Sequence, residues 1–162
     1  MYEIIIFLHV VGVFVFLLAH GASNAVAFAL RKERNMERVR ALLMLSPSTF
    51  GMMYGGLLLI LASGIIGGFM QSYWGQGWIW ASLVLLIVIV VAMSVYVTPY
   101  YGNLRKAAGL PFMEKMKIQS PQPSASDTEL AQMLESPRAI HGALIGWAGL
   151  LVILALMMFK PF

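Results

Sequence analysis

The three histidines of this chain are the residues whose chemistry points most directly to a bound cofactor. His9 and His20 lie eleven residues apart in one apolar stretch. On a helix that turns about 100° per residue, they therefore fall within about 20° of the same face. Asn24 lies one turn beyond His20, and Arg31 continues the same stripe. Ionisable residues in a membrane helix face neighbouring helices, where they bind a ligand or form interhelical hydrogen bonds.

The third histidine, His141, lies near the start of the last apolar stretch, at a depth similar to that of His20. Two imidazoles on different helices at one depth can ligate a haem iron axially inside a helical bundle. We therefore expect haem b or another porphyrin, with His20 and His141 as the iron ligands and arginines pairing with its propionates. The residues expected to hold it are His9, His20, Asn24, Arg31, Arg138 and His141. Each also has a structural alternative, as an interhelical contact or as a determinant of topology.

Other kinds of site are excluded by the composition. The chain has no cysteine, so disulfides, thiolate metal sites and cysteine nucleophiles are absent. Every aspartate and glutamate falls outside the long apolar stretches. A carboxylate proton relay within the membrane is therefore not available, which disfavours a pump or an ion-coupled transporter.

The composition is that of a polytopic membrane protein. Hydrophobic residues make up 60% of the 162 residues and charged residues 11%, and the mean hydropathy is +0.81. A bilayer core about 30 Å thick needs roughly 20 apolar residues per helix. We predict an all-α fold, a four-transmembrane-helix bundle in one membrane domain, residues 1–162. The expected spans are 4–30, 48–70, 79–98 and 138–159, joined by a surface helix at 34–45 and a cytoplasmic segment at 99–136.

The positions of the basic residues predict the topology. Ten of the eleven lysines and arginines fall in two segments that connect spans, residues 31–40 and 105–138. Under the positive-inside rule both segments are cytoplasmic. Both termini are then outside, and the membrane is expected to be a bacterial cytoplasmic membrane. The charges thus reflect topology, and the net charge of +4 does not indicate nucleic acid as a partner. The first stretch is longer than a signal-peptide core, so we expect it to be retained.

Short amphipathic helices are expected at the cytoplasmic surface. Residues 34–45 alternate apolar and basic positions at helical spacing, and Ser126 with Glu129 has the form of a capping box. Small residues four apart, such as Gly51 with Gly55 and Gly142 with Gly146, allow helices to approach closely in lipid.

Several segments resemble a known group of proteins. The stretches FLHVVGVFVFLLAHG, RALLMLSPS, YWGQGWIWASL and MMFKPF together resemble an uncharacterised group of small four-span bacterial integral membrane proteins. That group is distantly similar to HemJ-type protoporphyrinogen oxidases and to the membrane domain of CopD-type copper-resistance proteins. The HemJ resemblance implies that an imidazole of the first span, at the place of His9, meets haem or porphyrin. No enzymatic activity is carried over from it.

Three functions remain open at this point. The first is a haem-binding or porphyrin-binding membrane protein in a redox-related role. The second is a non-catalytic accessory or assembly subunit of a larger membrane complex, or a homo-oligomer, because the small-residue faces exceed what four short helices need. The third is permeation of copper or a small solute, suggested by the CopD resemblance and the twelve methionines.

Overall fold

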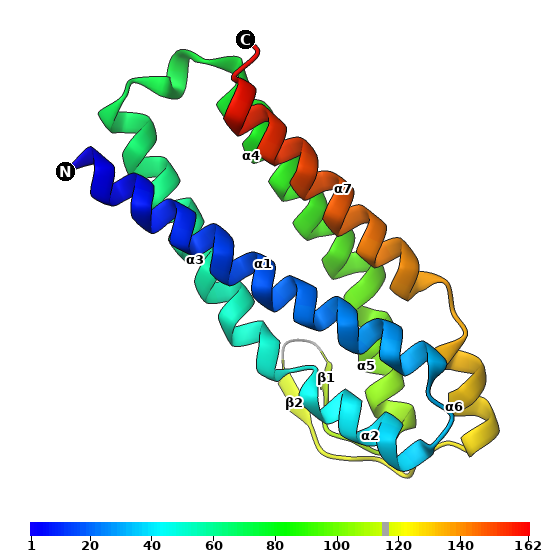
Figure 1. The fold of residues 1–162 in the computed structure, drawn as a ribbon. Coiled ribbons are helices and arrows are strands. Elements are labelled where there is room, and N and C mark those ends of the chain that lie inside the picture. The colour runs from blue at the N-terminus through cyan, green and yellow to red at the C-terminus, as the bar shows by residue number, and fades with distance from the viewer. Residues whose placement is uncertain (115–116) are drawn as a thin grey trace.

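Four long apolar helices lie side by side in the computed structural model, which describes residues 1–114 and 117–162 (Figure 1). They are α1 (Tyr2–Lys32), α3 (Ser48–Met70), α4 (Gly77–Ala92) and α7 (Arg138–Phe159). Each is long and apolar enough to cross a bilayer, the third because α4 continues without a break through the next two helical segments to Ala107. This confirms the predicted all-α fold class with four membrane helices. Both chain termini lie at the same end of the bundle (Figure 1).

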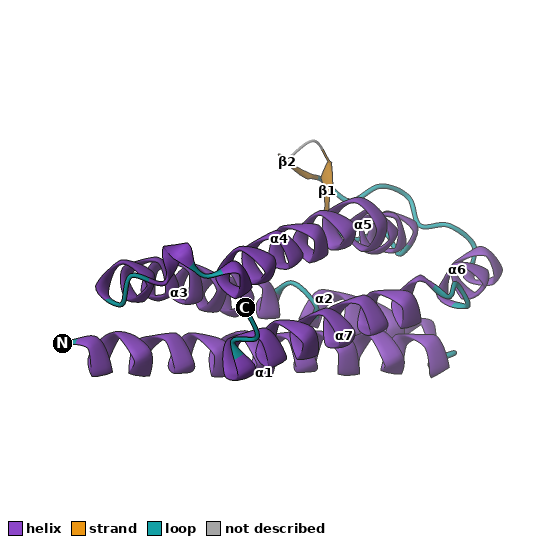
Figure 2. Ribbon diagram, turned by 90° about the horizontal axis from the view of Figure 1, so that it is seen from above, coloured by secondary structure: helices purple, strands orange, loops and turns teal. Residues whose placement is uncertain are grey.

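The bundle consists of two helical pairs (Figure 2). Helix α1 packs along α3 and α4 packs along α7, and a smaller contact joins α1 to α7. Glycines allow the closest approach within the first pair. A Cβ atom on Gly56 would lie 2.8 Å from the backbone nitrogen of Phe16, and one on Gly12 would lie 3.0 Å from that of Ile60. The two backbones therefore meet at a distance that only glycine permits.

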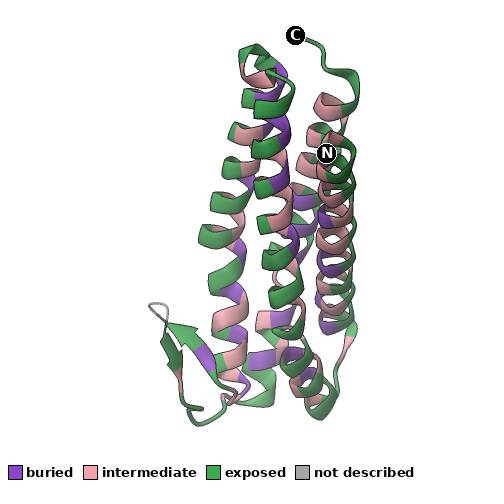
Figure 3. Ribbon diagram, turned by 90° about the vertical axis from the view of Figure 1, so that its left-hand side faces the viewer, coloured by how far each residue is buried: buried purple, intermediate pink, exposed green. Residues whose placement is uncertain are grey.

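The best-buried apolar residues lie at one end of the bundle, beyond the membrane helices. We call it the basic end, and it is formed by α2 (Met36–Leu45), α5 (Thr98–Ala107) and α6 (Asp127–Leu134). Their side chains pack around the last turn of α1. Six are at most 1% exposed: Leu30, Val39, Leu43, Leu104, Leu130 and Leu134. By contrast, only 17–22% of the residues in the apolar window of each span are buried, and the outward faces are exposed (Figure 3).

The difference follows from the solvent. Lipid tails are as apolar as leucine, so membrane helices gain nothing from burying apolar side chains against one another. At the basic end the surrounding solvent is water, and the hydrophobic effect favours a closed core. Hydrogen bonds then tie the surface elements to the spans: Arg31 Nη1 donates to the Ser136 carbonyl at 2.8 Å and the Tyr100 hydroxyl donates to the Met133 carbonyl at 3.1 Å.

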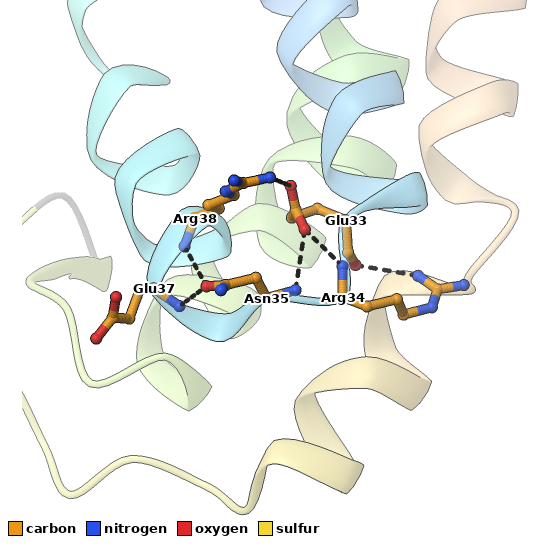
Figure 4. Close-up of polar contacts among 5 residues, drawn as sticks. All are labelled: Glu33, Arg34, Asn35, Glu37 and Arg38. Atoms are coloured by element: carbon orange, nitrogen blue, oxygen red, sulfur yellow. Dashed lines mark hydrogen bonds and ion pairs between the residues drawn. The ribbon is translucent and has the colours of Figure 1, made fainter.

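The turn between α1 and α2 is held by its own side chains (Figure 4). The backbone N–H groups of Arg34 and Asn35 both donate to the Glu33 carboxylate at 2.9 Å. Asn35 in turn caps α2, because its Oδ1 accepts hydrogen bonds from the backbone of Glu37 at 3.0 Å and Arg38 at 3.1 Å. The hydrogen bonds from the Asn35 and Arg34 N–H groups hold the pKa of Glu33 below its ordinary value.

The segment predicted as cytoplasmic, 99–136, has more regular structure than expected. Helix α5 continues the third span as far as Ala107, since Pro99 lies near its start, where a missing N–H costs little. An antiparallel hairpin follows, with strands β1 (Phe112–Glu114) and β2 (Lys117–Gln119), and then α6, which Ser126 caps through the Glu129 N–H. Residues 115–116, including the basic Lys115, lie outside the described residues.

Candidate functional site

The helix of the third span has one extra residue in the turn just before Pro99. Residues Met93–Val97 form the π turn η2, which joins α4 to α5. The Met93 carbonyl accepts hydrogen bonds from the backbone N–H of Thr98 and from its Oγ1, the latter at 3.2 Å. A proline ring crowds the carbonyl four residues earlier, and the wider turn relieves this conflict. The extra residue also rotates α5 around the helix axis relative to α4, and π turns are frequent at functional sites.

Tyr96 lies in this π turn and meets two side chains of α7. Its hydroxyl is 2.8 Å from His141 Nδ1, and the two rings stack with 6.0 Å between centroids and 19° between planes. The Arg138 guanidinium lies 5.4 Å from the centroid of the same tyrosine ring, on its face. Arg138 and His141 are three residues apart, so they share one side of α7. We call these three residues the Tyr96 cluster.

The Tyr96 cluster borders a shallow, widely open groove of about 530 Å³ on the outward face of α7. Its lining consists of Tyr96, His141, Leu144 and Ile145, and it opens away from the bundle, towards lipid. One ring nitrogen of His141 faces the tyrosine hydroxyl, which leaves Nε2 as the nitrogen free to meet a ligand. An imidazole held through one nitrogen presents the other in a fixed direction, as metal-ligating histidines do.

His20 is enclosed between α1 and α7 and is only 5% exposed. Its ring stacks on Phe16 at 6.0 Å and meets the edge of Trp147 at 5.8 Å. A Cβ atom on Gly146 would overlap the imidazole, so the glycine makes room for it. His20 Nε2 has no hydrogen-bond partner among the described residues. The ring therefore joins the two helical pairs through α1 and α7, and one of its polar atoms is left unsatisfied.

Asn24 and Arg31 continue the polar stripe of α1 in different ways. Asn24 Nδ2 is buried and, like His20 Nε2 one turn away, has no partner among the described residues. Buried polar atoms of this kind are commonly satisfied by bound water. Arg31, in contrast, is occupied by its hydrogen bond to the Ser136 carbonyl.

His9 joins α1 to α3. Its Nδ1 lies 3.1 Å from the Ile60 carbonyl oxygen and 3.1 Å from Ser63 Oγ, and Ser63 itself donates to the Leu59 carbonyl. Gly64 leaves space for the ring, because a Cβ there would lie 3.3 Å from His9 Cε1. This geometry is that of an interhelical hydrogen bond, the structural alternative for this residue.

The structure brings Arg138 and His141 together but does not bring His141 and His20 together. Gly146 and Trp147 of α7 lie against His20. His141 precedes Gly146 by five residues, about 140° around the helix, and faces outward. The two imidazoles therefore do not flank one cavity, and a haem ligated by both does not fit this arrangement.

Tyr96 is the member of the site that sequence reasoning missed. A tyrosine at the end of an otherwise aliphatic span, two residues before Thr98-Pro99, was the available signal. Its direction depends on the π turn, which no hydropathy pattern reveals.

No family model, curated protein or solved structure matches this chain. The resemblance to HemJ-type and CopD-type proteins thus gains no support from these comparisons. Among the described residues, no group of three or more histidine, aspartate or glutamate side chains is placed to hold a metal ion. What the fold itself defines is the class: a polytopic membrane protein built as a bundle of four long apolar helices.

Proposed function

We propose that this chain binds haem b or a related porphyrin from within the bilayer, at the groove beside the Tyr96 cluster. His141 is the iron ligand through Nε2, and Arg138 pairs with a propionate. The observation that carries the proposal is the His141 ring, whose Nδ1 lies 2.8 Å from the Tyr96 hydroxyl, at a shallow, open groove of about 530 Å³. The proposal also places the basic end in the cytoplasm of a bacterium, as the positive-inside rule predicts.

The residues of the groove match the chemical groups of a porphyrin. Leu144 and Ile145 offer an apolar wall to the macrocycle, and the Arg138 guanidinium offers charge-assisted hydrogen bonds to a carboxylate. The N-terminal end of α7 adds a favourable dipole for negative charge at the same place. A bound haem would supply one-electron redox chemistry, while the chain supplies the axial nitrogen, the orientation and the apolar surroundings.

Spectroscopy tests this function directly. The full chain is purified in mild detergent, and reduced-minus-oxidised spectra are recorded before and after addition of haemin. We expect a b-type spectrum that His141→Ala abolishes and that His9→Gln, a change at a histidine remote from the groove, leaves intact. A preparation that stays colourless with added haemin refutes the proposal. Loss of the spectrum in His20→Ala but not in His141→Ala would place the ligand between α1 and α7 instead.

A second candidate is an accessory subunit of a larger membrane complex, or a homo-oligomer. It is favoured by Gly51 and Gly55 of α3, which are four residues apart and exposed, and a Cβ atom on either glycine would meet no atom within 4 Å. Small residues at this spacing allow a helix of another subunit to approach closely. Native mass spectrometry after gentle solubilisation tests it: Gly51→Leu and Gly55→Leu should release the partner, and a monomer without partners refutes it. No specific observation favours copper or solute permeation.

A further inference from the structure

The hairpin of β1 and β2 presents one packed face and one apolar exposed face. Residues directly opposite each other in an antiparallel pair share a face. Phe112 pairs with Gln119 and is only 5% exposed, with the Lys106 ammonium 5.4 Å from its ring centroid. Met113 pairs with Ile118 on the other face, and these side chains are 66% and 80% exposed. The hairpin thus buries one side and turns two large apolar side chains outward.

The hairpin lies where the membrane surface is expected. Its strands lie beside α5 and reach back from the basic end towards the membrane helices (Figures 1 and 3). A Cβ atom on Gly102 would lie 3.9 Å from the Met113 carbonyl oxygen, which fixes the height of β1 along α5. Gly102 belongs to α5, which continues the third span as far as Ala107. Seen from above, the hairpin projects outward from the bundle at α5 (Figure 2).

We infer that this hairpin is a membrane anchor whose Met113 and Ile118 side chains insert into the interfacial layer of the bilayer that the helices span. The occupant of the exposed face is lipid, because the hairpin packs on α5, which continues the third span, and its strands reach back towards the membrane helices (Figures 1 and 3). The charges nearby are compatible with headgroups: Lys106 and Lys117 are exposed, and Glu114 lies opposite Lys117. Apolar insertion flanked by lysines is the pattern of interfacial segments.

This inference is independent of haem binding, since the Tyr96 cluster and the hairpin share no residue. It gives the hairpin a role in fixing the depth of α5, to which its Phe112 face is attached. It also accounts for the exposure of Met113 and Ile118, two large apolar side chains on the face opposite Phe112.

The chain has no cysteine, so each introduced cysteine is the single site of labelling. Ile118→Cys and Met113→Cys are each labelled with an environment-sensitive fluorophore, and the full chain is reconstituted in phosphatidylcholine–phosphatidylglycerol vesicles. Gln132→Cys, on the exposed side of α6, serves as the matched control. We expect blue-shifted emission at the two hairpin positions and quenching by lipids that carry a spin label near the headgroup. The control should respond to aqueous iodide instead.

Two results overturn the inference. In the first, the hairpin labels are quenched by iodide as strongly as the α6 label and not by spin-labelled lipid, which leaves the face in water. In the second, their emission changes with the protein-to-lipid ratio rather than with lipid quenchers, which makes a second copy of the chain the occupant.

Discussion

Replacing Leu134 by alanine tests whether the basic end carries most of the hydrophobic stabilisation of this fold. Leu134 is 0% exposed and belongs to the core that joins α1, α2, α5 and α6. A buried leucine truncated to alanine costs about 2–5 kcal/mol, from lost transfer free energy and the cavity left behind. Because every 1.4 kcal/mol is a factor of ten, the opening equilibrium of this end should rise by at least about 30-fold.

The matched control is Leu151→Ala in α7. Leu151 is 61% exposed on the outward face, where lipid covers it whether or not the helices are associated. The chemical change is identical, yet we expect almost no effect on stability. Amide hydrogen exchange of the chain in lipid nanodiscs measures both, since exchange reports local opening free energies.

The two variants should differ in where exchange accelerates as well as in how much. Leu134→Ala should speed exchange in α2, α5 and α6 together, because these elements share one core. An equal response to Leu151→Ala, or acceleration confined to α6 alone, would refute the view that this end is a single cooperative hydrophobic unit.

Three further predictions concern the helix crossing, the groove and the turn. Gly56→Leu should separate α1 from α3 and lower the thermal midpoint in detergent, whereas Gly55→Leu, with open space around it, should leave the midpoint of the monomer unchanged. Tyr96→Phe removes the hydroxyl that holds His141, so haem affinity in a titration should fall about 10–100-fold, as for other groups that orient a ligating histidine. The lowered pKa of Glu33 contributes stability that is present above its pKa in the unfolded chain and is lost as the pH falls through the lower pKa of the folded state. Glu33→Gln should therefore remove this acid-dependent part of hydrogen exchange in the turn.

Hydropathy predicts the four membrane helices because the thickness of the bilayer sets their length. The helix at 34–45 was expected from its amphipathic spacing, and α2 spans Met36–Leu45 with Asn35 as its cap. Strands of three residues are too short to give a periodic signal, so the hairpin was not predicted. The π turn was not predicted either. The Pro99 ring clashes with the carbonyl four residues earlier, and a helix can avoid this clash by forming a π turn or by ending, so the sequence does not show which one occurs.

The candidate site was predictable in its residues but not in its geometry. The three histidines and Arg138 follow from residue type and position, and two of these residues meet at the groove. Helix α7 is apolar around most of its circumference, so its sequence does not reveal which side faces the bundle. Depth alone therefore suggested that His141 would meet His20, whereas the rotation of α7 turns His141 outward and presents Gly146 instead.

The two helical pairs are joined at both ends of the bundle and are loosely packed between them. Between α3 and α4 lies a groove of about 370 Å³, lined by Leu57 and Leu61 of α3 and by aliphatic side chains of α4 from Leu83 to Val91. Lipid tails fill such a groove at little cost in free energy, so nothing drives these helices together. Association of the pairs then depends on the core of the basic end, on the His20 contact with α7 and on the loop that connects α3 to α4. At the far end the short loop between α3 and α4 links the two pairs, and its Trp74 ring lies 5.3 Å from Phe69 of α3 and 5.5 Å from Trp80 of α4, centroid to centroid.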